Sequence, residues 1–206
     1  QLLFYKKIKK KYYINVIFIG ILLLAQAVIG WYMVKSGLSE RVDVSQYRLT
    51  LHLTMAFIIL GLTFYTLVSY LFENNLINNN SVFIKKYNSL LIIIFIFICF
   101  QISYGAFVSG THSGLIYNTW PFYNGNILPF FESTQIRWLI NFFENGEYII
   151  FVHRTLAILI LLILFYLNYL IIMNKIQKNY FSVIVFFNIT FILQIVLGVS
   201  MTYLNI

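Results

Sequence analysis

Two histidines occupy the positions in this chain at which a side chain could do chemistry inside a membrane. His52 lies about one turn inside the hydrophobic run that begins at Arg48, and His153 lies similarly inside the run that begins at Tyr148. An ionisable side chain within a membrane span indicates a functional site, because such residues are rare and costly there. Neutral imidazole is a good metal ligand, and we therefore interpret both histidines as candidate ligands.

Haem iron is the metal that two isolated histidines fit best. Zinc needs three or four protein ligands, and the sequence holds no HExxH motif and no Cys/His cluster. Haem needs only one or two axial ligands and an apolar pocket, and helical bundles commonly supply them. The alternative interpretation is that each histidine only forms a hydrogen bond with a neighbouring helix near the membrane interface.

An arginine accompanies each histidine. Arg48 lies four residues before His52 on the same helix face and nearer the polar rim. There it could bind the anionic propionates of a haem. Arg154 directly follows His153 and therefore points elsewhere on its helix. For both arginines the alternative role is to extend along the apolar surface to the membrane interface.

The long segment 110–147 shows no catalytic pair. His112 lies in the Gly-rich stretch 110–114 and is expected to be a solvated loop residue. Glu132, Glu144 and Glu147 follow in the same segment, and spacing pairs none of them with another acid. We therefore assign no general acid–base couple and leave the catalytic residue unknown.

The composition indicates an integral membrane protein. Of the 206 residues, 61% are hydrophobic and 10% are charged, which is more apolar surface than a soluble domain can bury. Apolar runs long enough to span a bilayer occupy 13–34, 48–72, 89–109, 148–173 and 180–204. We predict an all-α, polytopic transmembrane helical bundle. The net charge of +8 does not indicate a nucleic-acid partner, because most lysines flank the spans.

Basic residues are more numerous on one side of the predicted spans. The first side carries the lysines of 1–12, 85–86 and 175–178, and the second carries Lys35, Arg41, Arg48 and Arg137. The positive-inside rule therefore puts the N-terminus of this segment on the cytoplasmic or matrix side. The loops 35–47 and 110–147 then lie outside, and both histidines belong to helices that enter from the outer face.

A QxxxG motif occurs three times, each time near the outer end of an outward-running helix. The copies are Gln26/Gly30, Gln101/Gly105 and Gln194/Gly198. Glycine permits close helix approach and glutamine can form a hydrogen bond across it, so we interpret the motif as helix packing. The repeated unit is an outgoing QxxxG helix, an outer loop and an incoming helix that can carry histidine. The third copy has no incoming helix, so we expect a fragment of a longer protein.

Several sequence blocks follow one another over nearly all the chain. They lie at 30–38, 44–49, 105–110, 114–121, 143–145 and 151–154, and the blocks WYMVKSGL (31–38) and YNTWP (117–121) are the most specific. Together they resemble the haem A synthases of the Cox15/CtaA family, in its alphaproteobacterial and mitochondrial branch. The resemblance implies an eight-helix protein made of two four-helix halves. Residues 1–78 would be the second helix pair of the N-terminal half, and 79–206 the first three helices of the C-terminal half.

The resemblance also implies an activity. Members of the family oxidise the C8 methyl group of haem O to a formyl group, which gives haem A for cytochrome oxidase. Of four helix histidines, two in each half, His52 matches the second and His153 the third. Each half would hold its own haem, so His52 would help to bind haem O or haem A and His153 a haem b cofactor. The family's catalytic glutamate precedes the first of these histidines and has no counterpart in this chain.

The implied partners are a haem O synthase that delivers the substrate, an electron donor and the lipid bilayer, with a homo-oligomer as a further option. The implied location is the bacterial inner (plasma) membrane or the mitochondrial inner membrane. One rival is a di-haem b-type electron-transfer cytochrome, which would bind haem without altering it. Another is a transporter or scaffold in which the histidines are structural.

Overall fold

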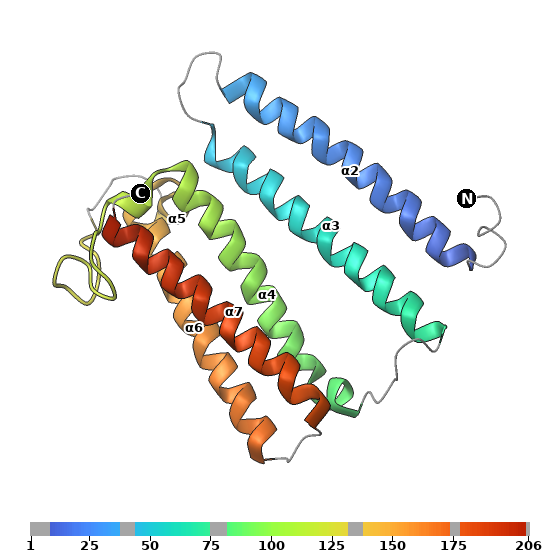
Figure 1. Cartoon of the computed structure of the whole chain (residues 1–206). Coiled ribbons are helices and arrows are strands. Elements are labelled where there is room, and N and C mark those ends of the chain that lie inside the picture. Colours follow the sequence, from blue (N-terminus) through green and yellow to red (C-terminus); the bar gives the residue numbers. More distant parts are fainter. Residues whose placement is uncertain (1–8, 38–43, 75–81, 132–137, 174–177, 205–206) are drawn as a thin grey trace. The chain divides into compact units, whose positions relative to one another are not determined.

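The computed structural model describes residues 9–37, 44–74, 82–131, 138–173 and 178–204. The long helices are α2 (Lys10–Gly37), α3 (Gln46–Glu73), α4 (Val82–Gly110), α6 (Gly146–Met173) and α7 (Lys178–Leu204) (Figure 1). Two short helices are η1 (Ser113–Leu115) and α5 (Trp138–Glu144). All five long helices are long and apolar enough to cross a membrane. The predicted all-α fold and the five predicted spans are therefore confirmed, whereas α5 was not predicted.

Each long helix begins a few residues before its predicted apolar run. Inside a bilayer every backbone polar group must be bonded internally, so helices continue into the interfacial residues that flank the apolar core. Large apolar side chains cover the outer faces of these helices, and Leu24, Phe64 and Phe186 are 71%, 65% and 68% exposed. Such surfaces suit contact with lipid, and the chain is a multi-pass membrane protein.

The predicted orientation stays a prediction. Several of the basic residues on which it depends lie outside the described residues, namely Lys6, Lys7, Arg41, Arg137 and Lys175. Glu132 of the segment 110–147 also lies outside them.

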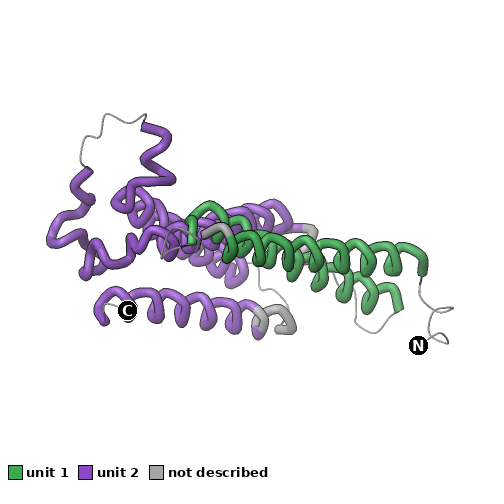
Figure 2. Tube along the Cα trace, turned by 90° about the horizontal axis from the view of Figure 1, so that it is seen from above, with its two compact units in different colours: residues 1–82 green, residues 83–206 purple. Residues whose placement is uncertain are grey.

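The chain forms two compact units, Gln1–Val82 and Phe83–Ile206 (Figure 2). The assignment of 1–78 and 79–206 to the two halves of an eight-helix protein involves helices beyond this chain, and it stays a prediction.

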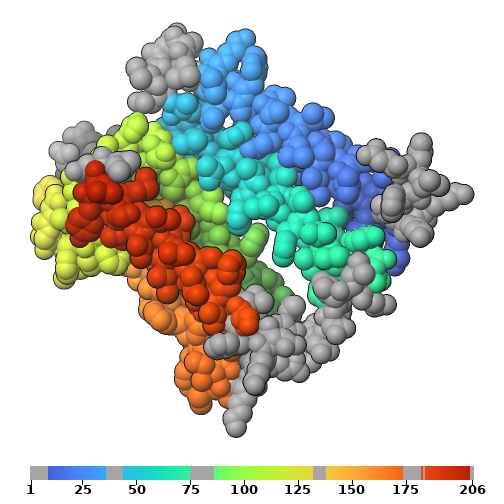
Figure 3. Space-filling model, in the orientation of Figure 1, coloured from blue at the N-terminus to red at the C-terminus, as the bar shows by residue number. Residues whose placement is uncertain are grey.

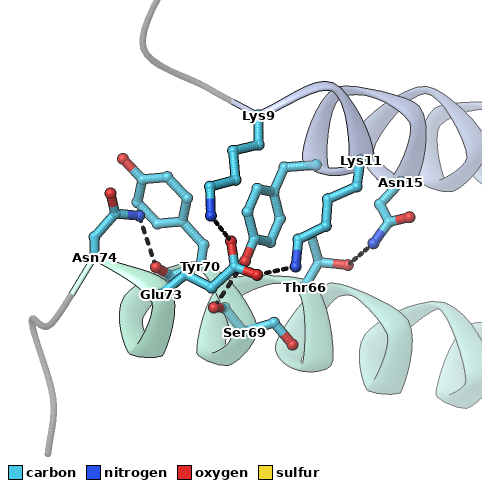
Figure 4. A network of polar contacts seen from close by, with 9 residues as sticks. Lys9, Lys11, Asn15, Thr66, Ser69, Tyr70, Glu73 and Asn74 are labelled. Carbon is cyan, nitrogen blue, oxygen red and sulfur yellow. Dashed lines mark hydrogen bonds and ion pairs between the residues drawn. The ribbon is translucent and has the colours of Figure 1, made fainter.

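In the first unit α2 and α3 run antiparallel, and a polar network joins the start of α2 to the end of α3 (Figure 4). Glu73 forms ion pairs with Lys11 and with Lys9, the latter at 3.0 Å. Tyr12 donates a hydrogen bond of 2.8 Å to the carbonyl oxygen of Ser69. This network fixes one end of the helix pair. The loop that connects α2 to α3 lies at the other end, about 40 Å away, because α2 has 28 residues and a helix rises about 1.5 Å per residue.

The second unit has an aliphatic core between α4 and α6. Ile94 of α4 packs with four buried residues of α6, namely Ile160, Leu164, Leu167 and Ile171. Helix α7 is joined to α6 by two amide hydrogen bonds, in which Asn168 and Asn188 each donate to the other at 3.2 and 2.9 Å. Reciprocal amide bonds of this kind stabilise helix association in lipid.

The segment 111–131 follows α4 and folds against the start of α6. After η1, a tight turn at Asn124 and Gly125 (φ 50° and 90°) brings Tyr123 and Asn126 into backbone hydrogen bonds with each other. These two positive φ values are typical of the Asn-Gly turn. Tyr117 and Tyr123 are buried against Ile150 of α6, so this segment has its own small core.

Candidate functional site

In the first unit the imidazole of His52 lies between α3 and α2. The amide nitrogen of Gln26 lies 3.3 Å from His52 Nε2 and donates a 2.9 Å hydrogen bond to the carbonyl oxygen of His52. A Cβ added to Gly30 would lie 2.9 Å from His52 Cε1, so the ring edge contacts the bare backbone of α2. One QxxxG motif therefore supplies both the polar partner of the histidine and the space that its ring occupies.

The second unit repeats this arrangement with different residues. The amide nitrogen of Gln101 on α4 lies 3.3 Å from both ring nitrogens of His153 on α6. A Cβ added to Gly105 would lie 3.4 Å from His153 Cε1. We call each arrangement, Gln26/Gly30/His52 and Gln101/Gly105/His153, an imidazole cradle. The sequence interpretation of QxxxG as a packing motif was correct but incomplete, because the packing partner in both units is the histidine.

A signal for this pairing was present in the sequence. Each glutamine lies in the C-terminal half of its helix and each histidine near the N-terminal end of the next long helix, so the two side chains share a depth. What the sequence lacked was the rotation of each helix about its axis, which decides whether the two faces meet.

The third QxxxG motif lies on α7 and is uncovered. Gln194 is exposed, and no heavy atom of the described chain lies within 4 Å of a Cβ added to Gly198. The viewed face of Figure 3 shows α7 (red) open along its length. Within the described residues the third motif therefore lacks the histidine that fills the other two.

Both cradles contain polar atoms that the described protein does not satisfy. Gln26 Oε1, His52 Nδ1 and Gln101 Oε1 are buried without a hydrogen-bond partner among the described residues. A buried polar atom left unpaired costs about 1–3 kcal/mol. Unpaired atoms beside an imidazole fit a site at which the ring turns to take a further ligand, as an axial ligand of haem must.

The described residues do not fit a metal site built from protein ligands alone. No group of three or more His, Cys, Asp or Glu side chains in the described ranges could hold a metal ion. Haem makes a smaller demand on the protein, because it brings its own equatorial ligands and needs only one or two axial ligands from side chains.

Arg48 lies at the same end of the helix pair as His52. Its guanidinium carbon is 4.7 Å from the ring centroid of Tyr32 on α2, within the range of a cation–π contact. The contact holds the positive charge at the rim of the first cradle. Binding of a propionate by Arg48 stays a prediction.

Arg154 does not extend to the membrane interface, which was one interpretation of the sequence, because its side chain is buried and the residue is only 6% exposed. Its Nη1 donates to the carbonyl oxygens of Thr119 (3.0 Å) and Phe122 (3.4 Å), and its Nη2 to that of Tyr117 (3.1 Å). The guanidinium also lies 4.9 Å from the ring centroid of Tyr123. Arg154 therefore fastens the segment that follows α4 to the helix that carries the second histidine.

Two aromatic side chains of the segment are buried beside Arg154. The Tyr117 and Tyr123 rings meet edge to face at 5.1 Å, and the Tyr117 hydroxyl donates to Glu147 Oε1 at 3.3 Å. Burial raises the pKa of both tyrosines, so both stay neutral near pH 7. His112, by contrast, is exposed at a backbone φ of 53°, as expected for a loop residue.

The five helices long enough to span a membrane and the two interhelical imidazole cradles, all within the described residues, define a polytopic helical membrane protein with a buried histidine site in each unit. A family model described as COX15-CtaA, cytochrome oxidase assembly protein, matches residues 1–206, and the chain belongs to this family. The resemblance seen in the sequence blocks is thereby confirmed.

Curated relatives named heme A synthase match nearly the whole chain. The protein from Wolbachia sp. subsp. Brugia malayi (strain TRS) is 41% identical over 207 residues, covering 98% of this chain and 57% of the relative. The protein from Pelagibacter ubique (strain HTCC1062) is 38% identical over 205 residues, covering 96% of this chain and 56% of the relative. The chain thus spans a little over half the length of these relatives. No solved structure matches it.

Proposed function

We propose that the full-length protein containing this chain is a haem A synthase, which oxidises the C8 methyl group of haem O to a formyl group. The observation that carries the proposal is the similarity, at about 40% identity over nearly the whole chain, to proteins named heme A synthase. The two imidazole cradles support it, because they present two histidines in separate units for two haems.

The two cradles would have different occupants. His52 would help to bind the substrate haem O and the product haem A, and Arg48 at the rim of that cradle would bind a propionate. His153 would be an axial ligand of a haem b cofactor, whose iron supplies one-electron redox chemistry when bound. The catalytic residue stays unassigned, because no acid–base pair occurs near either cradle among the described residues.

The surrounding residues of the chain have supporting roles in this proposal. The apolar side chains of α2, α3, α4 and α6 would exclude water from the hydrophobic macrocycles. Arg154 would keep the segment 117–123 in place beside the His153 helix. Methyl oxidation would proceed by successive hydroxylations and loss of water, with haem O supplied by a haem O synthase. Because the change from methyl to formyl is a four-electron oxidation, it would need an external oxidant such as O2, which would also take up the electrons from the separate donor.

The proposed location is the bacterial plasma membrane or the mitochondrial inner membrane, with the N-terminus of this segment on the cytoplasmic or matrix side. This orientation rests on the positive-inside rule. Both cradles would then lie toward the outer face, at the outer ends of their helices.

The test is a pigment analysis of the purified full-length protein, produced with a supply of haem O. Haem b together with haem O, its alcohol intermediate or haem A is the expected result. Haem b alone would replace the proposal with the di-haem electron-transfer cytochrome. An unpigmented protein would return both histidines to a structural role.

A further inference from the structure

We propose that Gln26 and Gln101 are positioning residues for haem ligation, each bonding one imidazole nitrogen so that the other nitrogen of His52 or His153 is presented to the iron. This inference rests on the proposed function and extends it to residues that do not themselves touch the metal. Its basis is the recurrence of one geometry in two units that share no residue.

An imidazole that binds iron through one nitrogen needs a hydrogen-bond acceptor for the other. Neutral imidazole has one lone pair and one N–H group, and the iron takes the lone pair. The remaining N–H group then needs an acceptor, which in metal sites also fixes the tautomer and the ring orientation. Within an apolar helix pair few acceptors exist, because helical carbonyl groups are already bonded along the helix.

In the first cradle the amide oxygen of Gln26 is a candidate for that acceptor. In the first cradle Gln26 Oε1 and His52 Nδ1 are both buried and both unpaired among the described residues. They belong to side chains already in contact, since Gln26 Nε2 lies 3.3 Å from His52 Nε2. A rearrangement of the two side chains that joins Oε1 to the Nδ1–H group would satisfy both atoms and leave the Nε2 lone pair for iron.

The second cradle offers the same adjustment. Gln101 Oε1 is buried and unpaired in the described chain, and the amide nitrogen lies 3.3 Å from each ring nitrogen of His153. The amide nitrogen is equidistant from the two ring nitrogens, so a turn of the amide that exchanges its nitrogen and oxygen would bring Oε1 beside either one. Oε1 could then accept from whichever ring nitrogen carries the proton and does not bind the iron. The unpaired amide oxygen is thus the common feature that the packing explanation leaves unexplained.

The glycine of each motif makes this contact possible. A Cβ at Gly30 would lie 2.9 Å from the His52 ring and one at Gly105 would lie 3.4 Å from the His153 ring. Because glycine lies one helical turn from the glutamine, it lets the imidazole come close enough to the helix for the amide to reach it.

The amide also sets the electronic character of the ligand. A carboxylate at this position would pull the N–H proton toward itself and give the imidazole anionic character, which favours ferric iron. A neutral carboxamide leaves the imidazole neutral. Replacement of glutamine by glutamate should therefore lower the midpoint potential of the haem. If the glutamine only packed against the ring, the same replacement would not be expected to shift the potential in a defined direction.

The experiment uses the full-length protein and the haem b that His153 is proposed to hold. Gln101→Met keeps the length of the side chain and removes the amide, and Gln101→Glu keeps a hydrogen-bond acceptor and adds a charge. Asn188→Leu is the matched control, because it removes a partly buried interhelical amide of the same unit that bonds Asn168 and no histidine. Haem retention during purification and the midpoint potential are measured for each protein.

We expect Gln101→Met to retain haem b about 10- to 100-fold more weakly, as for other residues that orient a metal ligand. Gln101→Glu should retain haem b with a midpoint potential lowered by roughly 60 mV, which corresponds to a tenfold preference for ferric iron in a one-electron couple. Asn188→Leu should leave both quantities unchanged.

Provided that the wild-type protein binds haem, either of two results would overturn the inference. One is wild-type haem retention in Gln101→Met, and the other is an unchanged midpoint potential in a Gln101→Glu protein that binds haem. A wild-type protein without haem would instead overturn the proposed function, and this inference with it. The two failures are therefore distinguishable in one set of preparations.

Discussion

The cradle geometry predicts that alanine is tolerated at Gly105 but not at Gly30. At Gly30 the added Cβ would lie 2.9 Å from His52 Cε1, so the ring must withdraw by about 0.5 Å to reach the 3.4 Å at which ordinary contact begins. At Gly105 the corresponding distance is already 3.4 Å. The same substitution therefore strains one cradle and leaves the other nearly undisturbed.

The withdrawal has a second consequence because Gly30 and Gln26 lie on the same face of α2. A ring that moves about 0.5 Å away from the face of α2 also moves away from Gln26 Nε2, so the present 3.3 Å separation lengthens, to at most about 3.8 Å. A separation of that size is too long for a hydrogen bond. Overpacking of this kind costs about 1–3 kcal/mol, which corresponds to about 5- to 150-fold weaker binding if all of it acts on the histidine.

The assay is the content of each haem per mole of purified full-length protein. Gly30→Ala should lose haem O and haem A and keep haem b, whereas Gly105→Ala should keep all of them. Gly20→Ala on the same helix is the control, because no heavy atom of the described chain lies within 4 Å of the added Cβ. Wild-type haem O and haem A content in Gly30→Ala would refute the reasoning, as would equal losses in Gly30→Ala and Gly20→Ala.

Three further predictions address the ligand, the fastened segment and the orientation. His52→Ala should abolish haem A formation in extracted pigment while the exposed-loop control His112→Ala does not, and wild-type haem A in His52→Ala would contradict the assignment. Arg154→Lys should lower the free energy of unfolding by about 1–3 kcal/mol and speed proteolysis of the segment 117–123. The reason is that an ammonium group cannot reach all three carbonyl groups that the guanidinium bonds. Unchanged proteolysis would show that Arg154 does not hold this segment in place. Asn126→Cys, exposed and placed in a Cys99→Ser background, should react with a membrane-impermeant thiol reagent from the outer face. Reaction only after the inner face is opened would reverse the orientation.

The spans could be predicted from sequence because crossing a bilayer imposes one simple requirement, a run of about 20 apolar residues. The pairing of those spans could not. Helices such as α2 and α7 are apolar around most of their circumference, so hydrophobic pattern alone does not indicate which face meets a neighbour. The glutamine and glycine of QxxxG were visible, but their contact with His52 and His153 depends on helix rotation.

The segment after α4 shows a different limit. Its conformation depends on a turn at Asn124 and Gly125 and on carbonyl groups that converge on Arg154. A single arginine beside a histidine carries no sequence signal that its partners are main-chain oxygens 32 to 37 residues earlier. The haem ligands themselves and the division into two halves remain predictions that pigment analysis and variants can test.

The reciprocal amide pair of Asn168 and Asn188 has a consequence for the order of assembly. At about 100° per residue, Asn188 and Gln194 lie about 120° apart around α7. Docking of α7 on α6 through the asparagines therefore turns the third QxxxG motif away from α6, in agreement with its exposure. Any helix that later packs on Gln194 and Gly198 would meet a surface whose orientation is already set, and would lose less entropy on docking.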